Sequence, residues 1–488
     1  MAHNFSQPAP HPETLEACHA LIDKLWTVVG DLSAQVEPLT SLLAAQKTQI
    51  AELESELARL KEKLGTNSSN SSKPPSSDPN RVRKKRKKGG KRGAKPGHPG
   101  HRRELVPPER VNELKNLWPQ GPCLCGGALT VPVGEPRRHQ VFELPPITAH
   151  VTEWRLFALA CERCGRCHRA GLPPEAPTGM LGPRATALVG LLEGPYHLSR
   201  RLIQQLLADV FGLKVSLGTV SNTEAVLTDA MAPAHQEVAD GVRAASVLNM
   251  DETSHTHCAR RHWTWVAFTR ALTFFLIRDS RSAEVAREIL GESQSAILGA
   301  DRYSAYGWVD PTRRQLCWAH LLRDFTRMRE RPGLSQSVGK SLLKLSATLF
   351  EHWERYKQGL IERVALIEQT EPIRVNVVRW LEFAAQRDSG KTGGTCKKLL
   401  ETRQALWTFL HKADVEPTNN AAERALRPLV IRRKLSFGTW SDRGDRFLER
   451  LLTLVATCRQ QGRDVLAFLT QTLEAHRLGL PPPSLVSG

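Results

Sequence analysis

Three acidic residues in the second half of the chain have sequence contexts that suit a metal site. Asp251 and Asp301 each follow a short apolar run typical of a buried strand, and Glu423 falls in the first turn of a helix that begins with Thr-Asn-Asn. Carboxylates at neighbouring strand ends repel one another unless a cation lies between them, and hard divalent ions such as Mg²⁺ prefer oxygen ligands. We therefore expect these carboxylates to bind divalent metal. Arg427, one helical turn beyond Glu423, would hold a phosphate or orient the glutamate.

The elements that must position these residues show strand periodicity between residues 245 and 330. Asp251 ends the first of three antiparallel strands, and Asp301 ends the fourth strand. The expected elements are strands 246–250, 262–269, 272–278, 295–300 and 314–318 and helices 281–290 and 319–328. Their order is that of a ribonuclease H-like core in an α/β multidomain protein, in which the ends of the first and fourth strands are neighbours. Asp251 should therefore lie beside Asp301.

A helical insertion is expected inside this core. Asp301 and Glu423 are separated by 121 residues, too many for a direct connection, and residues 331–412 are predicted to be helical. Residues 413–475 would complete the core. We expect the tryptophans of the insertion to be core residues rather than stacking platforms for a flipped base; they are Trp353, Trp380 and Trp407. A Gly-rich stretch at 389–395 follows no strand and lacks the spacing of a nucleotide-binding loop, which argues against ATP use.

Five of the ten cysteines lie between residues 123 and 167, which indicates a local metal cluster rather than a disulfide framework. Two pairs on glycine-containing turns, across a short β hairpin, can converge on one tetrahedral Zn²⁺. We expect one structural zinc in a β module at residues 111–178, with the ligands Cys123, Cys125, Cys161 and Cys164. Cys167 and His168 are the alternative ligands, because only one residue separates the first pair. Reduced cysteines in a small β subdomain are the other interpretation.

The amino-terminal region carries a heptad pattern. From Leu15 to Leu64, apolar residues recur at alternating intervals of three and four, which favours a coiled coil at residues 13–64. Gly30 and Pro38 interrupt the pattern, so it is as consistent with two helices and a kink as with one rod. A homodimer or higher oligomer is expected through this region. The alternative is that the two halves fold back on each other or pack on the body.

The net charge of +18 is concentrated in one segment. Residues 81–103 hold twelve of the 68 lysines and arginines and no acid, which leaves 56 basic against 50 acidic residues elsewhere. Such a block binds phosphates through counterion release, so we expect DNA as its partner; a solubilising tail is the alternative. The surrounding residues, 65–110, are expected to be a disordered linker. The predicted DNA contacts are Arg83, Lys84, Lys85, Arg86, Lys87, Lys88, Lys91, Arg92 and Lys95.

A helix-turn-helix-like region is expected at residues 179–240. A helix at 199–211 would end at Gly212, and Ser216 would cap the next helix after a short turn. The second helix would then enter a major groove. Helical hairpins are common, so a purely structural three-helix bundle is the alternative.

No apolar run approaches the ~18 residues that span a bilayer. The first ten residues also lack a basic start followed by an apolar stretch. We therefore expect a cytoplasmic protein with no membrane association. The last segment, residues 476–488, is expected to be disordered.

Several motifs in a fixed order resemble the large transposase of the insertion-sequence-66 family. They are LGTNSSNSSKPPSSD from residue 64, GGKRGAKPGHPGH, the cysteine cluster, MDET at 250–253, DRYSAY at 301–306, QLCWAHLLRDF at 315–325 and TNNAAERALRPLVIRRK at 418–434. The Cys-x-Cys pair departs from the usual family pattern. The resemblance implies a DDE transposase with Asp251, Asp301 and Glu423 as its acidic triad and His320 and Arg323 as supporting active-site residues. It also implies a bacterial, nucleoid-associated protein with small companion proteins encoded by the same element.

The mechanism expected from this resemblance is metal-assisted phosphoryl transfer on DNA with two Mg²⁺ or Mn²⁺ ions. One ion, held by Asp251 and Asp301, would activate water for nicking at an element end. The other, held by Asp251 and Glu423, would stabilise the leaving oxygen, and the exposed 3′ hydroxyl would then attack target DNA. The alternatives are a ribonuclease H-like nuclease without strand transfer and a transposase-derived DNA-binding protein without catalysis.

Overall fold

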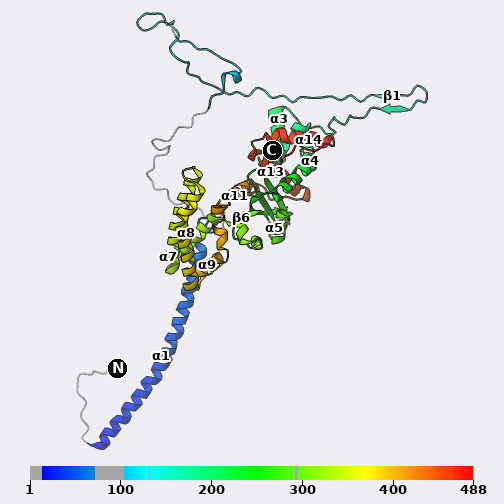
Figure 1. The fold of residues 1–488 in the computed structure, drawn as a ribbon. Helices are drawn as coiled ribbons and strands as arrows, with labels where there is room; N and C mark the ends of the chain where they lie inside the picture. Colours follow the sequence, from blue (N-terminus) through cyan, green and yellow to red (C-terminus); the bar gives the residue numbers. More distant parts are fainter. Residues whose placement is uncertain (1–13, 72–77, 79–103, 131, 292–294, 487–488) are drawn as a thin grey trace. The chain divides into compact units, whose positions relative to one another are not determined.

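The structure is a computed structural model that describes residues 14–71, 78, 104–130, 132–291 and 295–486 (Figure 1). The chain divides into two compact units, residues 1–84 and residues 85–488. The predicted DNA contacts between Arg83 and Lys95 lie outside the described residues. Among the described helices, none combines the length and the hydrophobicity that a membrane crossing requires.

The first unit is built on one long helix, α1 (Leu15–Leu64). Thr14 caps it by accepting a hydrogen bond from the Ala17 amide at 3.3 Å. The helix continues through Pro38, so of the two interpretations of the heptad pattern the structure has the single helix. The apolar side chains of the pattern are exposed on this helix: Leu25, Leu32 and Leu39 are 56, 55 and 59% exposed.

The residues directly after α1, at the start of the predicted linker, make local hydrogen bonds. The Asn67 amide donates to Asn70 Oδ1 at 2.8 Å, and the Ser68 amide donates to Asp78 Oδ1 at 2.7 Å. Asn, Ser and Asp side chains satisfy nearby backbone groups in this way. These bonds are local and involve no apolar core, and the disordered linker at 65–110 stays a prediction.

The second unit contains a five-stranded mixed sheet with the strand order β5-β4-β3-β6-β7. β3, β4 and β5 are antiparallel neighbours, whereas β3, β6 and β7 run parallel. The strands and the helices that follow them in the chain are β3 (Val247–His257), β4 (Arg260–Phe268), β5 (Thr273–Arg278), α5 (Ala283–Leu290), β6 (Ile297–Ala300), β7 (Arg314–Leu316) and α6 (Trp318–Glu330). This is the order of elements that the sequence predicts. β3 is longer than expected, so Asp251 lies inside the strand rather than at its end.

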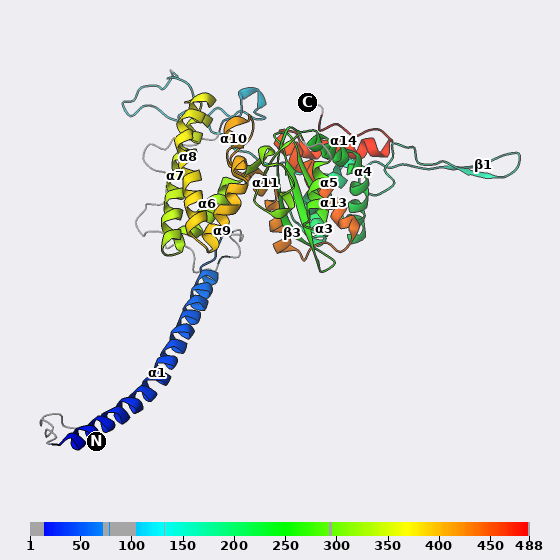
Figure 2. The same cartoon turned by 60° about the horizontal axis from the view of Figure 1, so that its bottom comes forward.

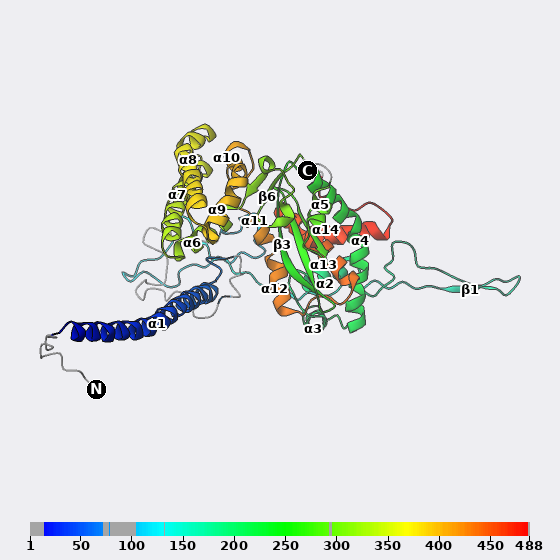
Figure 3. The ribbon, with the colours of Figure 1, turned by 90° about the horizontal axis from the view of Figure 1, so that it is seen from below.

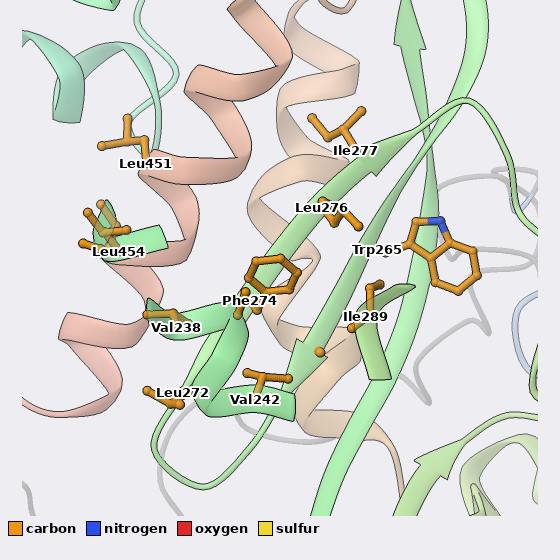
Figure 4. Packing of buried hydrophobic residues seen from close by; sticks show 14 of the residues in the cluster. Val238, Val242, Trp265, Leu272, Phe274, Leu276, Ile277, Ile289, Leu451 and Leu454 are labelled. Atoms are coloured by element: carbon orange, nitrogen blue, oxygen red, sulfur yellow. The ribbon is translucent and has the colours of Figure 1, made fainter. Parts of the chain in front are cut away.

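Helices cover both faces of the sheet. On one face, α4 (Leu217–Arg243) and α13 (Asp442–Gln460) pack on β5, and Figure 4 shows the cluster that they form, with Val238, Val242, Phe274, Leu276, Leu451 and Leu454 among its residues. On the other face, α11 (Asn420–Ala425) and α12 (Arg427–Leu435) contribute Ala422, Leu426 and Leu429 to a smaller cluster. Figure 3 shows α12 beside β3.

Side chains of α13 also protect the edge strand of the sheet. Glu449, Thr453 and Thr457 lie one turn apart on α13 and accept hydrogen bonds from the amides of Ile277, Phe275 and Thr273, at 2.9, 2.9 and 3.1 Å respectively. An unpaired edge strand would leave these amides unsatisfied, and each buried, unpaired donor costs about 1–3 kcal/mol. The helix thus replaces a sixth strand.

Thr453→Val is expected to lower the free energy of unfolding by about 1–3 kcal/mol, because it keeps the shape of the side chain and leaves the Phe275 amide without an acceptor. Urea denaturation would measure the change. Thr348→Val is the matched control, because the Thr348 hydroxyl also donates to the carbonyl four residues back, that of Lys344, but faces no strand. Equal stability of the two variants would contradict this role of Thr453.

Helices fill most of the chain between the two halves of the core. They are α7 (Leu334–Lys357), α8 (Arg363–Arg387), α9 (Lys391–Glu401) and α10 (Thr408–His411), and the first three lie side by side (Figure 2). Trp353 and Trp407 are buried in the bundle and Trp380 packs against the same cluster, which confirms that they are core residues. The Gly-rich stretch at 389–395 leads from α8 into α9 with no strand before it, as the sequence predicts.

The helix-turn-helix-like region contains α2 (Pro183–Glu193), α3 (Arg200–Phe211) and the start of α4. Gly212 ends α3 with a φ of 65°, a left-handed conformation that favours glycine, and Ser216 caps α4 by accepting from the Thr219 amide at 3.0 Å. Both boundaries agree with the sequence prediction. The three helices enclose a small core of their own that consists of Val189, Ile203, Leu207, Val215 and Val220.

Residues 478–486, which follow α14 (Val465–Arg477), contact the rest of the second unit, and the disordered tail at 476–488 stays a prediction. Leu485 is only 3% exposed, and its amide donates to Glu237 Oε2 at 3.1 Å. Arg463 Nη1 also donates to the Ser484 carbonyl at 2.6 Å. One buried leucine and these partners for the backbone hold the segment on the body.

Candidate active site

The parallel pairing of β3 with β6 brings the first two carboxylates together. Asn249 on β3 lies opposite Gly299 on β6. Asp251 and Asp301 therefore each lie two residues beyond this pair, on neighbouring segments of the same chain. Successive side chains of a strand point to opposite faces. Because Met250 belongs to the cluster beneath α4 and α13, Asp251 faces the side of the sheet that α11 and α12 cover.

One asparagine attaches the third carboxylate to this pair. Asn419 Nδ2 donates to the Met250 carbonyl on β3 at 2.7 Å, and the Asn419 amide donates to Cys317 Sγ at 3.1 Å. Both contacts fix the start of α11, and Glu423 lies in the first turn of this helix, as predicted. The connection through the helical bundle therefore returns to the sheet next to Asp251.

The electrostatics agree with three carboxylates in one site. The pKa of Asp251 is raised well above its usual value of 3.8, first by burial and then by the negative charges of Glu252, Asp301 and Glu423. Glu423 Oε1 is buried and has no hydrogen-bond partner among the described residues. Negative charge without enough donors is the condition that a bound cation relieves. The donor set, oxygen only, fits Mg²⁺ or Mn²⁺.

His320 and Arg323, both on α6, contact Glu423. His320 Nδ1 lies 3.7 Å from Glu423 Oε1, and Arg323 Nη2 lies 3.8 Å from Glu423 Oε2. Arg323 Nη1 is also 3.2 Å from His320 Nε2. Burial, helped by the charge of Arg323, lowers the pKa of His320 against the opposing pull of Asp301 and Glu423, so the imidazole is neutral at neutral pH.

Arg427 does not join this group. It is exposed at the first position of α12, and in the described part of the chain it pairs with no carboxylate. The arginine beside Glu423 is Arg323. The predicted role of orienting the glutamate therefore falls to Arg323, while contact with a phosphate stays a proposal for Arg427.

Sequence reasoning missed two residues that organise the site, Cys317 and Asn419. Cys317 is buried, which raises the pKa of its thiol to about 11, and its sulfur accepts the Asn419 amide. The sequence indicates Asn419 only as part of a helix start. The Cys-x-x-His spacing of Cys317 and His320 at the start of α6 was the available signal.

A buried network behind Asp251 was also missed. Glu252 accepts a hydrogen bond from the Tyr306 hydroxyl and one from Arg281 Nε at 2.7 Å. The Arg281 guanidinium lies 3.7 Å from the centre of the Tyr303 ring, and the Tyr303 amide donates to Asp301 Oδ1 at 2.8 Å. The network thus fixes the segment that follows Asp301. Its residues lie in the MDET and DRYSAY motifs and directly before α5.

A match to a known protein family identifies the family to which this chain belongs. The family model described as "Transposase IS66 family" matches residues 178–446, more than half of the chain, and includes the three carboxylates, His320 and Arg323. The chain belongs to the IS66 transposase family. This confirms the resemblance of the sequence motifs. A family of unknown function matches residues 7–104.

Two uncharacterized proteins of Sinorhizobium fredii are similar to this IS66 family chain. Protein y4qI is 26% identical over 410 residues, which cover 76% of this chain and 74% of the relative. Protein y4hP is 27% identical over 388 residues, which cover 72% and 69% respectively. The similarity therefore extends over most of all three chains.

The zinc-finger binding domain of transposase IS66 matches residues 122–165, a range that contains all four predicted zinc ligands and ends before Cys167. Cys123 and Cys125 lie on one turn, and Cys161 and Cys164 lie on another beside the hairpin of β1 (Ala158–Ala160) and β2 (Cys167–Arg169). Within the described residues the two pairs do not meet in one cluster.

Each cysteine pair is arranged locally for metal binding. A hydrogen bond from the Gly127 amide, followed by one from the Cys123 thiol, lowers the pKa of Cys125. Amide donors of Cys164 and Arg163 lower the pKa of Cys161 in the same way. Thiolates are the form that binds zinc, so the lowered pKa of Cys125 and of Cys161 favours the form that can act as a ligand.

Proposed function

We propose that this IS66 family chain is a DDE transposase that cleaves DNA at the ends of an insertion sequence and joins the exposed ends to target DNA. The observation that carries the proposal is the placement of the partly buried residues Asp251, Asp301 and Glu423, which come from β3, the end of β6 and α11. The strand order, with β3 in the centre, antiparallel β4 and β5 on one side and parallel β6 and β7 on the other, supports a ribonuclease H-like core.

The three carboxylates are proposed to bind two Mg²⁺ or Mn²⁺ ions. Such ions would supply an activated water or hydroxyl nucleophile and neutralise the charge of the leaving oxygen. Arg323 and neutral His320 hold the Glu423 side chain from the α6 side. Arg323 and exposed Arg427 offer cationic groups to the DNA phosphates.

A cleavage and joining assay tests this function. Wild-type protein that retains its zinc would be incubated with a duplex that contains an element end and its flanking DNA, together with a target plasmid. Nicking at the end and a joined product, both dependent on added Mg²⁺ or Mn²⁺, are expected. Nicking without joining would favour the nuclease alternative, and DNA binding with neither reaction would favour the regulator without catalysis.

Asn419 is proposed to be a positioning residue, because it attaches the Glu423 helix to β3 through the Met250 carbonyl. Asn419→Ala is expected to reduce the apparent Mg²⁺ affinity or the cleavage rate by about 10–100-fold, the usual effect of losing an outer-sphere contact at a metal site. The Mg²⁺ dependence of cleavage measures it. Asn376→Ala is the matched control, because Asn376 makes the same type of bond, to the Pro372 carbonyl at 2.8 Å, at an exposed position of α8. Unchanged Mg²⁺ dependence in Asn419→Ala would contradict the role.

Two regions are proposed to contact DNA in addition to the active site. The basic arm at 81–103 supplies twelve positive charges and no negative charge. The exposed start of α4, after the Ser216 cap, is the second candidate, for contact with a major groove.

Deleting residues 81–103 is expected to flatten the salt dependence of nonspecific DNA binding. The slope of log K against log salt should fall by about 0.9 for each phosphate contact that is lost. Fluorescence anisotropy at several salt concentrations measures the slope, and Mg²⁺ binding at the carboxylates should stay as in the wild type. An unchanged slope would refute the role of the arm.

The remaining proposals concern assembly and location. The exposed apolar side chains along α1 support a coiled-coil homodimer or higher oligomer. One structural zinc is proposed at Cys123, Cys125, Cys161 and Cys164, which the zinc-finger match supports.

Action on element ends in a bacterial nucleoid implies a cytoplasmic location, and small companion proteins of the same element are proposed partners.

A further inference from the structure

A second type of metal-ligand set lies against the carboxylate site. Cys317, His320 and Glu423 each offer one ligand atom, and these atoms lie within 4.8 Å of one another. His320 Nδ1 and Glu423 Oε1 are 3.7 Å apart, slightly more than the ~3.3–3.6 Å that separates two ligands of one tetrahedral ion with bonds of about 2.0–2.2 Å. No other group of three or more such residues occurs in the part of the chain that the structure describes.

The local fold holds these ligands in place before an ion binds. Cys317 is the residue before α6, and His320 lies in the first turn of that helix, so the two share one end of α6. The segment that carries Glu423 docks on the same end, where the Trp318 amide donates to the Pro417 carbonyl at 2.9 Å. The sulfur of Cys317 also accepts the Asn419 amide.

Unpaired polar atoms point to a missing ligand here. His320 Nδ1 and Glu423 Oε1 are both buried, and neither has a hydrogen-bond partner within the described residues. Buried polar atoms are rarely left in this state, and a bound ion is one of the explanations. The set of one sulfur, one nitrogen and one oxygen differs from the all-oxygen set of the triad. It suits Zn²⁺ and similar transition-metal ions rather than Mg²⁺.

We propose that Cys317, His320 and Glu423 bind a zinc-like transition-metal ion, and that this ion inhibits cleavage because it takes Glu423 away from the catalytic site. The ion replaces the thiol proton of Cys317, which passes to solvent, and no electron is transferred. The binding half of the inference stands alone, whereas the inhibitory half rests on the proposed function.

The binding half is tested by counting zinc in the full-length, reduced protein. Metal-free protein would be titrated with Zn²⁺ against a chelating indicator, which also counts any ion in the zinc-finger module. Cys317→Ser is expected to bind one equivalent less than the wild type. Cys458→Ser is the control, because Cys458 is an equally buried free thiol on α13 outside any such cluster of described residues. The same count in Cys317→Ser and in the wild type would overturn the site.

A second variant, His320→Gln, and two spectroscopic measurements distinguish the loss of a metal ligand from a folding defect. His320→Gln should lose the same equivalent, and circular dichroism should match the wild type in both variants. With Co²⁺ in place of Zn²⁺, the thiolate-to-cobalt absorption of the wild type should exceed that of Cys317→Ser by the contribution of one thiolate. Identical cobalt spectra would also overturn the site.

The inhibitory half is tested by cleavage in constant Mg²⁺ with increasing Zn²⁺, each protein being compared with its own zinc-free rate. Wild type and Cys458→Ser should be inhibited, and Cys317→Ser should need at least tenfold more Zn²⁺ for the same inhibition. Equal inhibition of all three would overturn the inhibitory role. If no protein cleaves DNA under any condition, the proposed function fails, while the zinc count still decides whether the site exists.

Discussion

Asp251→Asn is expected to reduce DNA cleavage by at least ~1,000-fold and, at the same time, to stabilise the protein in the absence of Mg²⁺. Asp251 is the carboxylate proposed to contact both ions, and an amide supplies neither the charge nor the second oxygen that they need. The same carboxylate is buried among Glu252, Asp301 and Glu423, which raises its pKa well above the usual 3.8. Removing one negative charge from this group relieves repulsion that only metal otherwise offsets.

The pH dependence of stability has a definite sign. Folded Asp251 holds its proton more tightly than unfolded Asp251 does, so the folded state binds more protons and the stability of the wild type falls as pH rises above about 3.8. This loss continues until pH exceeds the raised pKa and is constant beyond it. Asp251→Asn has no such group, so its stability advantage over the wild type should grow with pH across the same window.

Urea denaturation of the zinc-containing protein between pH 4 and pH 8, without Mg²⁺, measures this advantage. Added Mg²⁺ should then stabilise the wild type and have little effect on Asp251→Asn, because only the wild type binds it well. Asp229→Asn, an exposed change on α4, is the control and should alter neither stability nor cleavage. A variant that is less stable than the wild type without Mg²⁺ would show that Asp251 has a structural role instead.

The core could be predicted because its signals are local. The apolar runs before Asp251 and Asp301 and the meander between them are properties of short segments, and the parallel pairing of β3 and β6 follows from their order. The length of β3 could not be predicted. Its second half, Thr253–His257, is polar, and a strand there depends on residues far along the chain.

Those distant residues form the loop between α12 and α13. The Thr439 amide donates to the Thr256 carbonyl at 2.9 Å, and the Cys258 amide donates to the Thr439 carbonyl at 2.8 Å. Gly438 permits this approach, because its φ is +99° and an added Cβ would lie 2.1 Å from the Thr256 carbonyl oxygen. His255 then pairs with buried Asp445 at 3.0 Å. No pattern within β3 reveals these contacts.

The site shows the same division between local and distant signals. Asp251 and Asp301 are conspicuous in the sequence because each follows an apolar run, and their grouping with Glu423 stays a proposal. Asn419 and Cys317 are not conspicuous, because their roles arise from the contact between α6 and the start of α11. A short polar residue and a buried thiol are unremarkable until the fold brings them together. The chain returns from the helical bundle to the five-stranded sheet at this contact.

Glu423→Gln tests whether the residue that α11 brings to the sheet binds metal. The substitution is expected to lower the cleavage rate by at least ~100-fold. The substitution keeps the size of the side chain and removes the charge that the metal and Arg323 use, so residual cleavage should need more Mg²⁺ than the wild type does. Glu401→Gln, an exposed change at the end of α9, should leave both the rate and the Mg²⁺ dependence unchanged.

The effect of Glu423→Gln should also be smaller than that of Asp251→Asn, because Glu423 is proposed to contact one ion and Asp251 both. Single-turnover cleavage over a range of Mg²⁺ concentrations separates loss of metal affinity from loss of rate at saturating metal. Equal cleavage by Glu423→Gln and the wild type would remove Glu423 from the triad. The acidic pair Asp251 and Asp301 would then need a different third ligand, and the contact of Asn419 with β3 would have only a structural purpose.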